Sequence, residues 1–277
     1  MPLSTLADGL SATSFKELTG LIRTHSGIAL GDDKRTLVAN RLRKRVHSLG
    51  YDSYEAYCKL LGSAAGAVEI DMLIDLVTTN HTFFYREPDH FRYLADVALP
   101  ELSAKGVAAR LWSAAVSSGE EAYTMAMVAA ETTRRIPGLN WQIVGSDISR
   151  RMVSMAEKAI YPIDALQPVD SVLTKRYFER GVGKQEGMCR VQATLRERVR
   201  LQRINLLQSA YPLDGLQHII FCRNVMIYFD AAARSLVVDN LTRQLAPGGY
   251  LFVGYSETLG SNPRGLEPVQ HGVYRRI

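Results

Sequence analysis

Cysteine is scarce in this chain of 277 residues, and the three that occur, Cys58, Cys189 and Cys222, lie far apart. Disulfide frameworks and structural zinc sites need closely spaced cysteines, often as Cys-x-x-Cys pairs, and no such pair is present. The sequence therefore indicates neither a disulfide framework nor a bound metal. We expect three reduced thiols, most of them buried.

Long apolar runs are also lacking. No segment approaches the roughly 20 apolar residues that a membrane-spanning helix requires. Residues 1–8 lack the basic start and continuous apolar core of a signal peptide. With 47% hydrophobic and 22% charged residues, the composition is that of a folded protein. We therefore expect a cytoplasmic protein that does not insert into membranes.

Acidic residues are missing from one basic stretch. Between Lys34 and Tyr51 the chain has six Lys or Arg residues and no Asp or Glu, and its net charge is +5. Asp33 is suited to cap a helix at the start of this stretch, and Gly50 is suited to the position after its end. The basic side chains opposite and flanking the apolar face of that helix are Arg41, Arg43, Lys44, Arg45 and His47. An uncompensated basic face favours binding to an acidic partner over a solvated surface without a role.

The chain divides into a helical part, residues 1–85, and a part in which strands and helices alternate, residues 86–277. The expected strands are 110–115, 141–145, 199–204, 217–222 and 250–253, and the expected helices between them are 120–134, 150–159 and 231–245. Strands separated by helices of this length indicate right-handed crossovers and a mainly parallel α/β sheet. Residues 178–203, rich in glycine, predict an inserted antiparallel β-subdomain. Pro247-Gly248-Gly249 predicts a turn before the last strand.

The turn after the first predicted strand carries the most chemical information. It consists of small residues, and the helix after it begins with Glu120 and Glu121. Dinucleotide-binding folds place a pyrophosphate at this helix N-terminus, where two carboxylates would repel it. The turn also has one glycine, Gly119, where a GxGxxG motif has three. A ligand with a cationic amine or sulfonium suits this turn, which favours S-adenosylmethionine (SAM) over NAD or ATP.

Other candidate residues lie where strands end, because ligands of open parallel sheets bind beyond the carboxyl ends of the strands. The small Ala114 lets a ligand approach the backbone. Asp147 suits either the ribose hydroxyls or the cap of the following helix. The remaining candidates at strand ends are Asn205, Leu206, Arg223, Asn224 and Tyr228. An aromatic ring beside a sulfonium contributes about 0.5–2 kcal/mol through a cation–π interaction.

The segment that joins the two parts, residues 78–87, mixes polar and aromatic side chains. It includes Arg86, whose guanidinium suits a bidentate pair with a carboxylate. An ordinary linker packed by Phe83 and Phe84 explains the same residues, and composition does not decide between the two.

Five segments together resemble one known family. They read TTNHTFFYRE (78–87), LWSAAVSSGEEAYTMAM (111–127), IVGSDIS (143–149), FCRNVMIYFD (221–230) and APGGYLFVGYSETL (246–259). In order and spacing they resemble the chemotaxis receptor methyltransferases, the CheR family, and the likeness extends over nearly the whole chain. The resemblance implies a Rossmann-like SAM-dependent methyltransferase domain with a β-subdomain, preceded by an all-α domain. It also implies methyl transfer from SAM to glutamate side chains on chemoreceptor cytoplasmic helices, giving glutamyl methyl esters and S-adenosylhomocysteine.

The resemblance also implies roles for single residues. The SAM pocket would be formed by Asn80, Thr82, Arg86, Ala114, Glu120, Asp147, Ile148, Asn205, Leu206, Arg223 and Asn224. Within it, Glu120 would bind the ammonium group and Asp147 the ribose. As a hypothesis, Arg86 or Arg223 orients the incoming glutamate carboxylate, and Tyr228 lies beside the transferring methyl group. A glutamate is already ionised at neutral pH, so no general base is expected.

Two features are assigned to the receptor by the same resemblance. Arg41, Arg43, Lys44 and Arg45 are the candidates for contact with acidic receptor helices. Residues 180–191 resemble the β-subdomain of members that bind a C-terminal receptor pentapeptide as an added strand. There Gly181 and Gly183 would permit close backbone approach, and Arg190 would bind a peptide carboxylate. Val116 and Tyr255 depart from the residues common in the family, Cys and His, but neither supplies a group that the mechanism needs.

Other classes of function stay open beside this one. A catalytically silent receptor-binding adaptor would keep the fold without binding SAM. A small-molecule methyltransferase predicts an enclosed pocket with an apolar lid, which suits the basic helix poorly. An NAD oxidoreductase is disfavoured by Gly119 and its two following carboxylates. A nucleic-acid methyltransferase would fit the net charge, but the Asn/Asp-Pro-Pro-aromatic tetrad of amino methyltransferases is absent.

Overall fold

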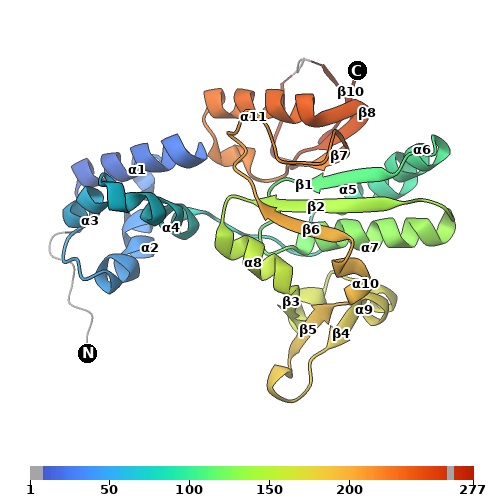
Figure 1. The fold of residues 1–277 in the computed structure, drawn as a ribbon, viewed down its shortest axis with the longest axis horizontal. Helices are drawn as coiled ribbons and strands as arrows, with labels where there is room; N and C mark the ends of the chain where they lie inside the picture. Colours follow the sequence, from blue (N-terminus) through green and yellow to red (C-terminus); the bar gives the residue numbers. More distant parts are fainter. Residues whose placement is uncertain (1–8, 261–264) are drawn as a thin grey trace. The chain divides into compact units, whose positions relative to one another are not determined.

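The structure, a computed structural model, describes residues 9–260 and 265–277. It divides into two compact units. The first comprises the N-terminal region through Thr79 together with Tyr228–Ala233, and the second comprises Asn80–Ile227 and Arg234–Ile277. Figure 1 shows helices alone in the first unit and a mixture of strands and helices in the second. Among the described residues, no helix combines the length and apolar character that a membrane span requires.

In the part of the helical unit that the structure describes there are four α-helices: α1 (Ala12–Ser26), α2 (Arg35–Ser48), α3 (Tyr54–Leu61) and α4 (Ala67–Val77). The core consists of apolar side chains spaced three or four residues apart, as an amphipathic helix requires; they include Phe15, Leu18, Ile22, Val38, Leu42 and Val46. Ser11 and Ser53 cap α1 and α3 through their side chains. The segment Tyr228–Ala233 joins this unit through a β-bridge between Ile28 and Phe229.

The expected start of α2 is wrong by one residue, because its N-cap is Lys34 and not Asp33. Asp33 belongs to a short 3-10 helix, η1 (Asp32–Lys34), and α2 begins at Arg35 without a side-chain cap. Asp33 instead forms an ion pair with the neighbouring Lys34, 2.8 Å between Oδ2 and Nζ. The expected end is confirmed, because Gly50 follows the C-cap with φ of +78°, a conformation that glycine adopts without strain.

The second unit is built on a seven-stranded sheet with the order β6-β2-β1-β7-β8-β10-β9. Its strands are β1 (Ala109–Ser113), β2 (Trp141–Asp147), β6 (Val199–Arg203), β7 (Gln217–Phe221), β8 (Leu245–Phe252), β9 (Leu266–Gln270) and β10 (Val273–Arg276). The first five are parallel to one another, and β10 pairs antiparallel with both β8 and β9. The mainly parallel sheet expected from the alternation is therefore confirmed.

Helices accompany the strands of this unit. They are α5 (Pro88–Tyr93), α6 (Leu99–Ala104), α7 (Glu120–Arg135), α8 (Arg150–Lys158), α9 (Ser171–Tyr177), α10 (Ala193–Arg196) and α11 (Ala231–Gln244), with a π-helical turn at Leu94–Ala98. Helix α7 packs against β1, β2 and β6, and α8 packs against β2 and β6. The buried core here is aromatic and aliphatic, and its largest members include Trp112, Tyr123, Phe84, Phe221 and Phe252.

A second, three-stranded antiparallel sheet has the order β3-β5-β4 and is visible beside α9 and α10 in Figure 1. It consists of β3 (Ile160–Pro162), β4 (Phe178–Arg180) and β5 (Met188–Val191). The sequence predicted a hairpin within 178–203 and did not assign β3 as a strand. The structure pairs β3 with β5, and β6, at the end of that range, belongs to the large sheet.

The expected turn at Pro247-Gly248-Gly249 does not precede the strand, although Gly248 has the positive φ of a turn residue, +71°. These residues lie inside β8, which begins at Leu245. The pairing register between β7 and β8 shifts between Gln217 and Ile219, so the irregularity that the glycines allow is absorbed as a bulge within the strand.

Candidate functional site

The ligand crevice of an open parallel sheet lies where the strand order reverses. Here the chain runs outward from β1 to β2 and β6, then returns to β7 on the other side of β1. The reversal therefore lies between β1 and β7, and a hydrogen bond of 2.7 Å from Ala114 N to Phe221 O joins their ends. The loops beyond this point begin at Ala114 and Cys222, and of the expected pocket residues they carry Ala114, Arg223 and Asn224.

The loop after β1 is held in a tight turn. Gly119 has φ of +105°, and a Cβ there would lie 2.7 Å from the Tyr161 hydroxyl, so only glycine fits. Ser117, also at positive φ, donates its N–H to Asp147 Oδ2 at 2.8 Å. Asp147 thereby fixes the turn from the end of β2. Asp147 is not the cap of α8, as one reading of the sequence allowed, because Ser149 accepts the capping hydrogen bond from Met152 N.

Glu120, the first residue of α7, is a buried carboxylate with 8% of its surface exposed. Its Oε2 accepts a hydrogen bond of 2.7 Å from Ser118 Oγ, and among the described residues it forms no ion pair. Burial raises the pKa of Glu120, while the bond from Ser118 acts in the opposite direction. A buried carboxylate without a cation is costly for the fold, and a positively charged ligand would offset that cost.

Glu121 is equally buried but its charge is compensated. Its Oε2 lies 2.7 Å from Arg223 Nε, and its Oε1 accepts from Ser113 Oγ at 2.7 Å. The two adjacent carboxylates therefore differ in role, because one is neutralised within the protein and the other is not. The sequence showed two acidic residues at the helix start without indicating this division.

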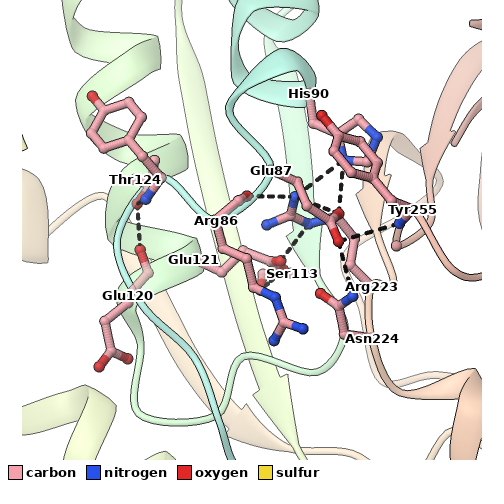
Figure 2. Close-up of polar contacts among 12 residues, drawn as sticks. Arg86, Glu87, His90, Ser113, Glu120, Glu121, Thr124, Arg223, Asn224 and Tyr255 are labelled. Atoms are coloured by element: carbon pink, nitrogen blue, oxygen red, sulfur yellow. Dashed lines mark hydrogen bonds and ion pairs between the residues drawn. The ribbon is translucent and has the colours of Figure 1, made fainter. Parts of the chain in front are cut away.

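Arg223 lies at the centre of a buried polar cluster, whose hydrogen bonds and ion pairs Figure 2 shows. Only 1% of its side chain is exposed, and besides Glu121 its guanidinium contacts Glu87 Oε2 at 3.3 Å and the carbonyl of Arg86 at 2.8 Å. It also lies over the ring of Phe91 at 5.0 Å from the centroid. These contacts join β7, the start of α7 and the segment before α5.

His90 contributes a neutral ring to the same cluster. Burial, followed by the charge of Arg223, lowers the pKa of His90 to about 4. At neutral pH the imidazole is therefore uncharged. Its Nδ1 then accepts a hydrogen bond from Arg223 Nη1 at 3.1 Å and adds no positive charge beside the guanidinium.

The segment before α5 is strained. Tyr85 and Glu87 both have positive φ, 57° and 59°, which costs free energy unless the surroundings hold the backbone in place. Glu87 Oε1 accepts from Asn224 Nδ2 at 3.0 Å and from Tyr255 N at 3.2 Å. Arg86 is half-buried as a residue, but its guanidinium donates to His81 O at 2.8 Å in an exposed position outside this buried cluster. The backbone and side chain of Arg86 therefore point to different surroundings (Figure 2).

The other residues expected to bind SAM lie in the same unit. Asn80 accepts a hydrogen bond from Ser117 Oγ at its carbonyl, 3.0 Å away, which brings the linker segment to the turn after β1. Asn205 follows β6, and its Oδ1 accepts from Leu207 N at 3.0 Å. The carbonyl of Ile148 accepts a hydrogen bond from Arg203 Nε.

Three further expected pocket residues are described by their burial. Leu206 and Ala114 are buried, the latter at the end of β1, and Thr82 is half-buried. Their roles toward a ligand stay predictions.

Tyr228 belongs to the helical unit, where its carbonyl accepts from Ala29 N at 2.8 Å. Its side chain is half-buried. The chain reaches Tyr228 directly from the loop after β7, which carries Arg223 and Asn224. The role of Tyr228 at the methyl group stays a prediction.

The basic side chains of α2 fall into two groups. Arg41 is half-buried and donates through Nη1 to the carbonyls of Val77 and Thr78, which closes the end of α4. Arg45 forms a bidentate pair with Glu69, a carboxylate that is 6% exposed, at 2.6 and 2.9 Å. Arg43 and Lys44 are exposed. The structure thus gives Arg41 and Arg45 contacts within the unit and leaves Arg43 and Lys44 on its surface.

Glu69 depends on two partners. Burial acts to raise the pKa of Glu69, but hydrogen bonds from Arg45 and Tyr57 outweigh burial and lower it. Replacing Arg45 by methionine should lower the free energy of unfolding by about 1–3 kcal/mol, because Glu69 stays buried and charged without its cation. Since Arg45 is 31% exposed, we expect the lower part of that range.

The matched control is Arg43→Met, which removes the same charge from the exposed face of α2 and should change stability by less than about 0.5 kcal/mol. Urea denaturation followed by circular dichroism measures both variants. Equal stability of the two would show that the Arg45–Glu69 pair does not stabilise the unit.

The three residues expected to bind a receptor peptide lie in the small sheet. Gly181 donates its N–H to Met188 O at 2.9 Å, and a Cβ there would collide with the carbonyl of Gln185, so its close backbone contact is within the hairpin itself. Gly183 has φ of +58° and open space around it. Arg190 is exposed on β5 and donates through Nε to Lys158 O at 3.1 Å.

Taken together, these features define an α/β protein whose ligand crevice carries a buried carboxylate suited to a positively charged ligand. Comparison with known proteins identifies the family within this class. Residues 80–274 match the model of the CheR methyltransferase SAM binding domain, and residues 13–78 match the model of the CheR methyltransferase all-alpha domain.

Individual relatives agree with these matches. The chain is 40% identical to a chemotaxis protein methyltransferase of Escherichia coli, over 90% of this chain and 85% of that protein. It is 37% identical to one of Salmonella typhimurium, over 91% and 86%. It is 31% identical to one of Borreliella burgdorferi, over 96% and 95%. The chain belongs to the CheR methyltransferase family. It is a SAM-dependent methyltransferase of chemotaxis, as the sequence predicted.

Proposed function

We propose that this chain transfers a methyl group from SAM to glutamate side chains on the cytoplasmic helices of chemoreceptors. The observation that carries the proposal is Glu120, a buried carboxylate that forms no ion pair among the described residues and lies at the reversal point of the sheet. The cationic amino-acid end of SAM supplies the missing charge. The same carboxylate disfavours nucleotides that would place a phosphate at the start of α7.

The residues around this point have the chemistry that SAM requires. We assign the ammonium group to Glu120, the ribose to Asp147, and the adenine to the side chains of Asn205 and Leu206. The bound SAM supplies an electrophilic methyl group whose transfer leaves a neutral thioether. Since the glutamate nucleophile and the sulfonium carry opposite charges that are neutralised together, a site from which water is excluded favours the reaction. The contribution of the protein is then proximity and alignment, on the order of 7–11 kcal/mol at most.

Arg86 is the residue that we propose to orient the incoming carboxylate. Its guanidinium lies outside the buried cluster and donates to His81 O at an exposed position, whereas Arg223 Nε and Nη1 bind groups inside that cluster. A guanidinium beside the methyl path would hold the glutamate by two parallel hydrogen bonds. We therefore assign orientation of the substrate to Arg86 and keep Arg223 as a neighbour that shapes the pocket.

The decisive experiment identifies the chemical bond that is formed. Purified protein is incubated with radiolabelled SAM and a chemoreceptor cytoplasmic fragment, and the product is treated with base. Methyl esters of carboxylates hydrolyse to volatile methanol, whereas N-methyl groups stay on the protein. We expect volatile label from the fragment and none when its acceptor glutamates are replaced by alanine. Non-volatile label would overturn the glutamate assignment. No label together with measurable receptor binding would identify a catalytically silent adaptor.

The exposed face of α2 provides a proposed contact with the receptor. Arg43 and Lys44 lie on it, and a positively charged face accelerates and favours association with acidic helices. Reversing both charges, Arg43→Glu with Lys44→Glu, should raise KM for the receptor fragment about tenfold or more at low salt and leave kcat near its original value. Steady-state kinetics at two salt concentrations measures this. An unchanged KM with intact folding would remove α2 from the receptor surface.

The small sheet provides a second proposed contact, with a receptor C-terminal pentapeptide. Strand β4 lies at the edge of this sheet, where an extended peptide can add as a further strand. Exposed Arg190 on β5 offers a charge for a peptide carboxylate. Receptor fragments with and without the pentapeptide are compared in the assay above. A lower KM for the longer fragment supports docking at this sheet, and equal KM values contradict it.

A further inference from the structure

Glu257 lies in the turn after β8 and is 7% exposed. Its two carboxylate oxygens accept four backbone N–H groups. Oε2 lies 2.7 Å from both Asn224 N and Gly254 N, and Oε1 lies 2.7 Å from Met226 N and 3.2 Å from Ile227 N. Among the described residues no cation pairs with it. Its charge is therefore stabilised by main-chain dipoles alone.

Three of these four donors belong to one short loop. The loop follows β7 and runs through Asn224 to Ile227, after which the chain continues to Tyr228. Asn224 has φ of 57°, a conformation that is strained for a residue with a side chain. A carboxylate that accepts several N–H groups at once offsets such strain, because each charge-assisted hydrogen bond is stronger than a neutral one.

The neighbouring residues are fitted to the same contact. A Cβ on Gly254 would collide with Asn224 Nδ2 and would lie 2.8 Å from Glu257 Oε2, so glycine is required where the turn meets the loop. Asn224 Nδ2 and Tyr255 N both donate to Glu87 Oε1, and Figure 2 shows these two residues on either side of Glu87. The loop after β7 is thereby held from two directions.

We propose that Glu257 is a positioning residue for methyl transfer: its carboxylate fixes the backbone of residues 224–227 and thereby places Asn224. The inference rests on the proposed function and on the expected place of Asn224 in the SAM pocket. In the proposed role Glu257 itself contacts neither SAM nor the substrate. Its effect is transmitted through the loop backbone.

Glu257→Gln tests the proposal with little change in size. The amide keeps one acceptor oxygen and turns an NH2 group toward backbone N–H donors, so about half of the contact is lost. We expect kcat to fall about 100-fold, the magnitude associated with misplacement of a catalytic group by about 1 Å. KM for SAM and for the receptor fragment should change less than threefold. Glu257→Asp keeps both oxygens on a shorter side chain and should recover part of kcat.

Hydrogen–deuterium exchange and the methanol assay of the wild-type protein distinguish a failure of this inference from a failure of the proposed function. Hydrogen–deuterium exchange of residues 224–227 reports the loop directly: we expect faster exchange in Glu257→Gln and no change in Glu267→Gln, an exposed control on β9. Unchanged exchange in folded Glu257→Gln would overturn the inference, whatever the kcat of that variant. Faster exchange with unchanged kcat would keep the hydrogen-bonded loop and reject its catalytic role. If wild-type protein releases no methanol from its product, the proposed function fails, and exchange still decides the structural claim.

Discussion

Replacement of Glu120 by glutamine should weaken SAM binding by about 10- to 100-fold, because it removes a charge-assisted hydrogen bond of about 1.5–3 kcal/mol. The side chain keeps its shape, and the hydroxyl of Ser118 still has an oxygen to donate to. The loss therefore reports charge and not volume. Isothermal titration of SAM and S-adenosylhomocysteine measures the change.

The same variant should be at least as stable as the original protein at neutral pH. Burial raises the pKa of Glu120, so the folded state disfavours its ionised form. For a carboxyl group with a raised folded pKa, the stabilising contribution is full below the unfolded pKa and is lost as pH rises through the folded pKa. Glutamine removes that cost. A variant that loses the ligand and keeps or gains stability indicates a residue selected for binding.

The pH dependence of SAM binding has the opposite sign to the pH dependence of the stability contributed by Glu120. In the original protein, affinity for SAM should fall as pH decreases through the raised pKa of Glu120, since a neutral carboxyl no longer binds the ammonium group strongly. Glu120→Gln should show no such decline. Glu157→Gln, an equal change of charge at an exposed position of α8, provides the control and should bind SAM normally. Equal affinity of both variants would show that Glu120 is not the ammonium site.

The sequence predicted the five parallel strands of the large sheet, because they are short apolar runs separated by helices, and it missed the antiparallel strands β9 and β10. The expected helix 120–134 and the observed α7 differ by one residue. Long-range pairing was harder to predict. Ile160–Pro162 has three residues and no alternation, and it is a strand because β5 pairs with it. The glycines of β8 predicted a turn before a strand, but they lie within the bounds of β8. There they interrupt the ladder, because the β7 partners are Leu245 and then Tyr250 onward, and Gly248 has φ of +71°.

The candidate site was predictable as a set of residues but not as a set of contacts. The positions 120, 147 and 223 follow from where strands end, since that rule depends on topology alone. Nothing in the sequence indicates that Glu121 binds Arg223, 102 residues away, or that Arg45 serves Glu69. Glu87 and Glu257 lie in segments that the sequence singled out. Their roles emerge only when the loops meet, because they act on the backbone of other segments.

The largest effect on stability should come from Arg223, whose removal leaves two carboxylates buried. Arg223→Met should lower the free energy of unfolding by about 3–5 kcal/mol, the cost of breaking a buried ion pair on one side. Arg135→Met, which breaks the exposed pair with Asp96, should cost less than about 1 kcal/mol. Urea denaturation measures both.

A double variant separates charge from packing. Glu121→Gln with Arg223→Met removes the carboxylate that lies closest to the guanidinium, so it should be more stable than Arg223→Met alone. Recovery should be partial, because Glu87 also loses its cation but keeps the hydrogen bonds from Asn224 and Tyr255. If the double variant is no more stable than Arg223→Met, the guanidinium acts mainly through packing on Phe91. If Arg223→Met stays fully folded and loses only turnover, Arg223 acts on the substrate directly, and the orienting role returns to it from Arg86.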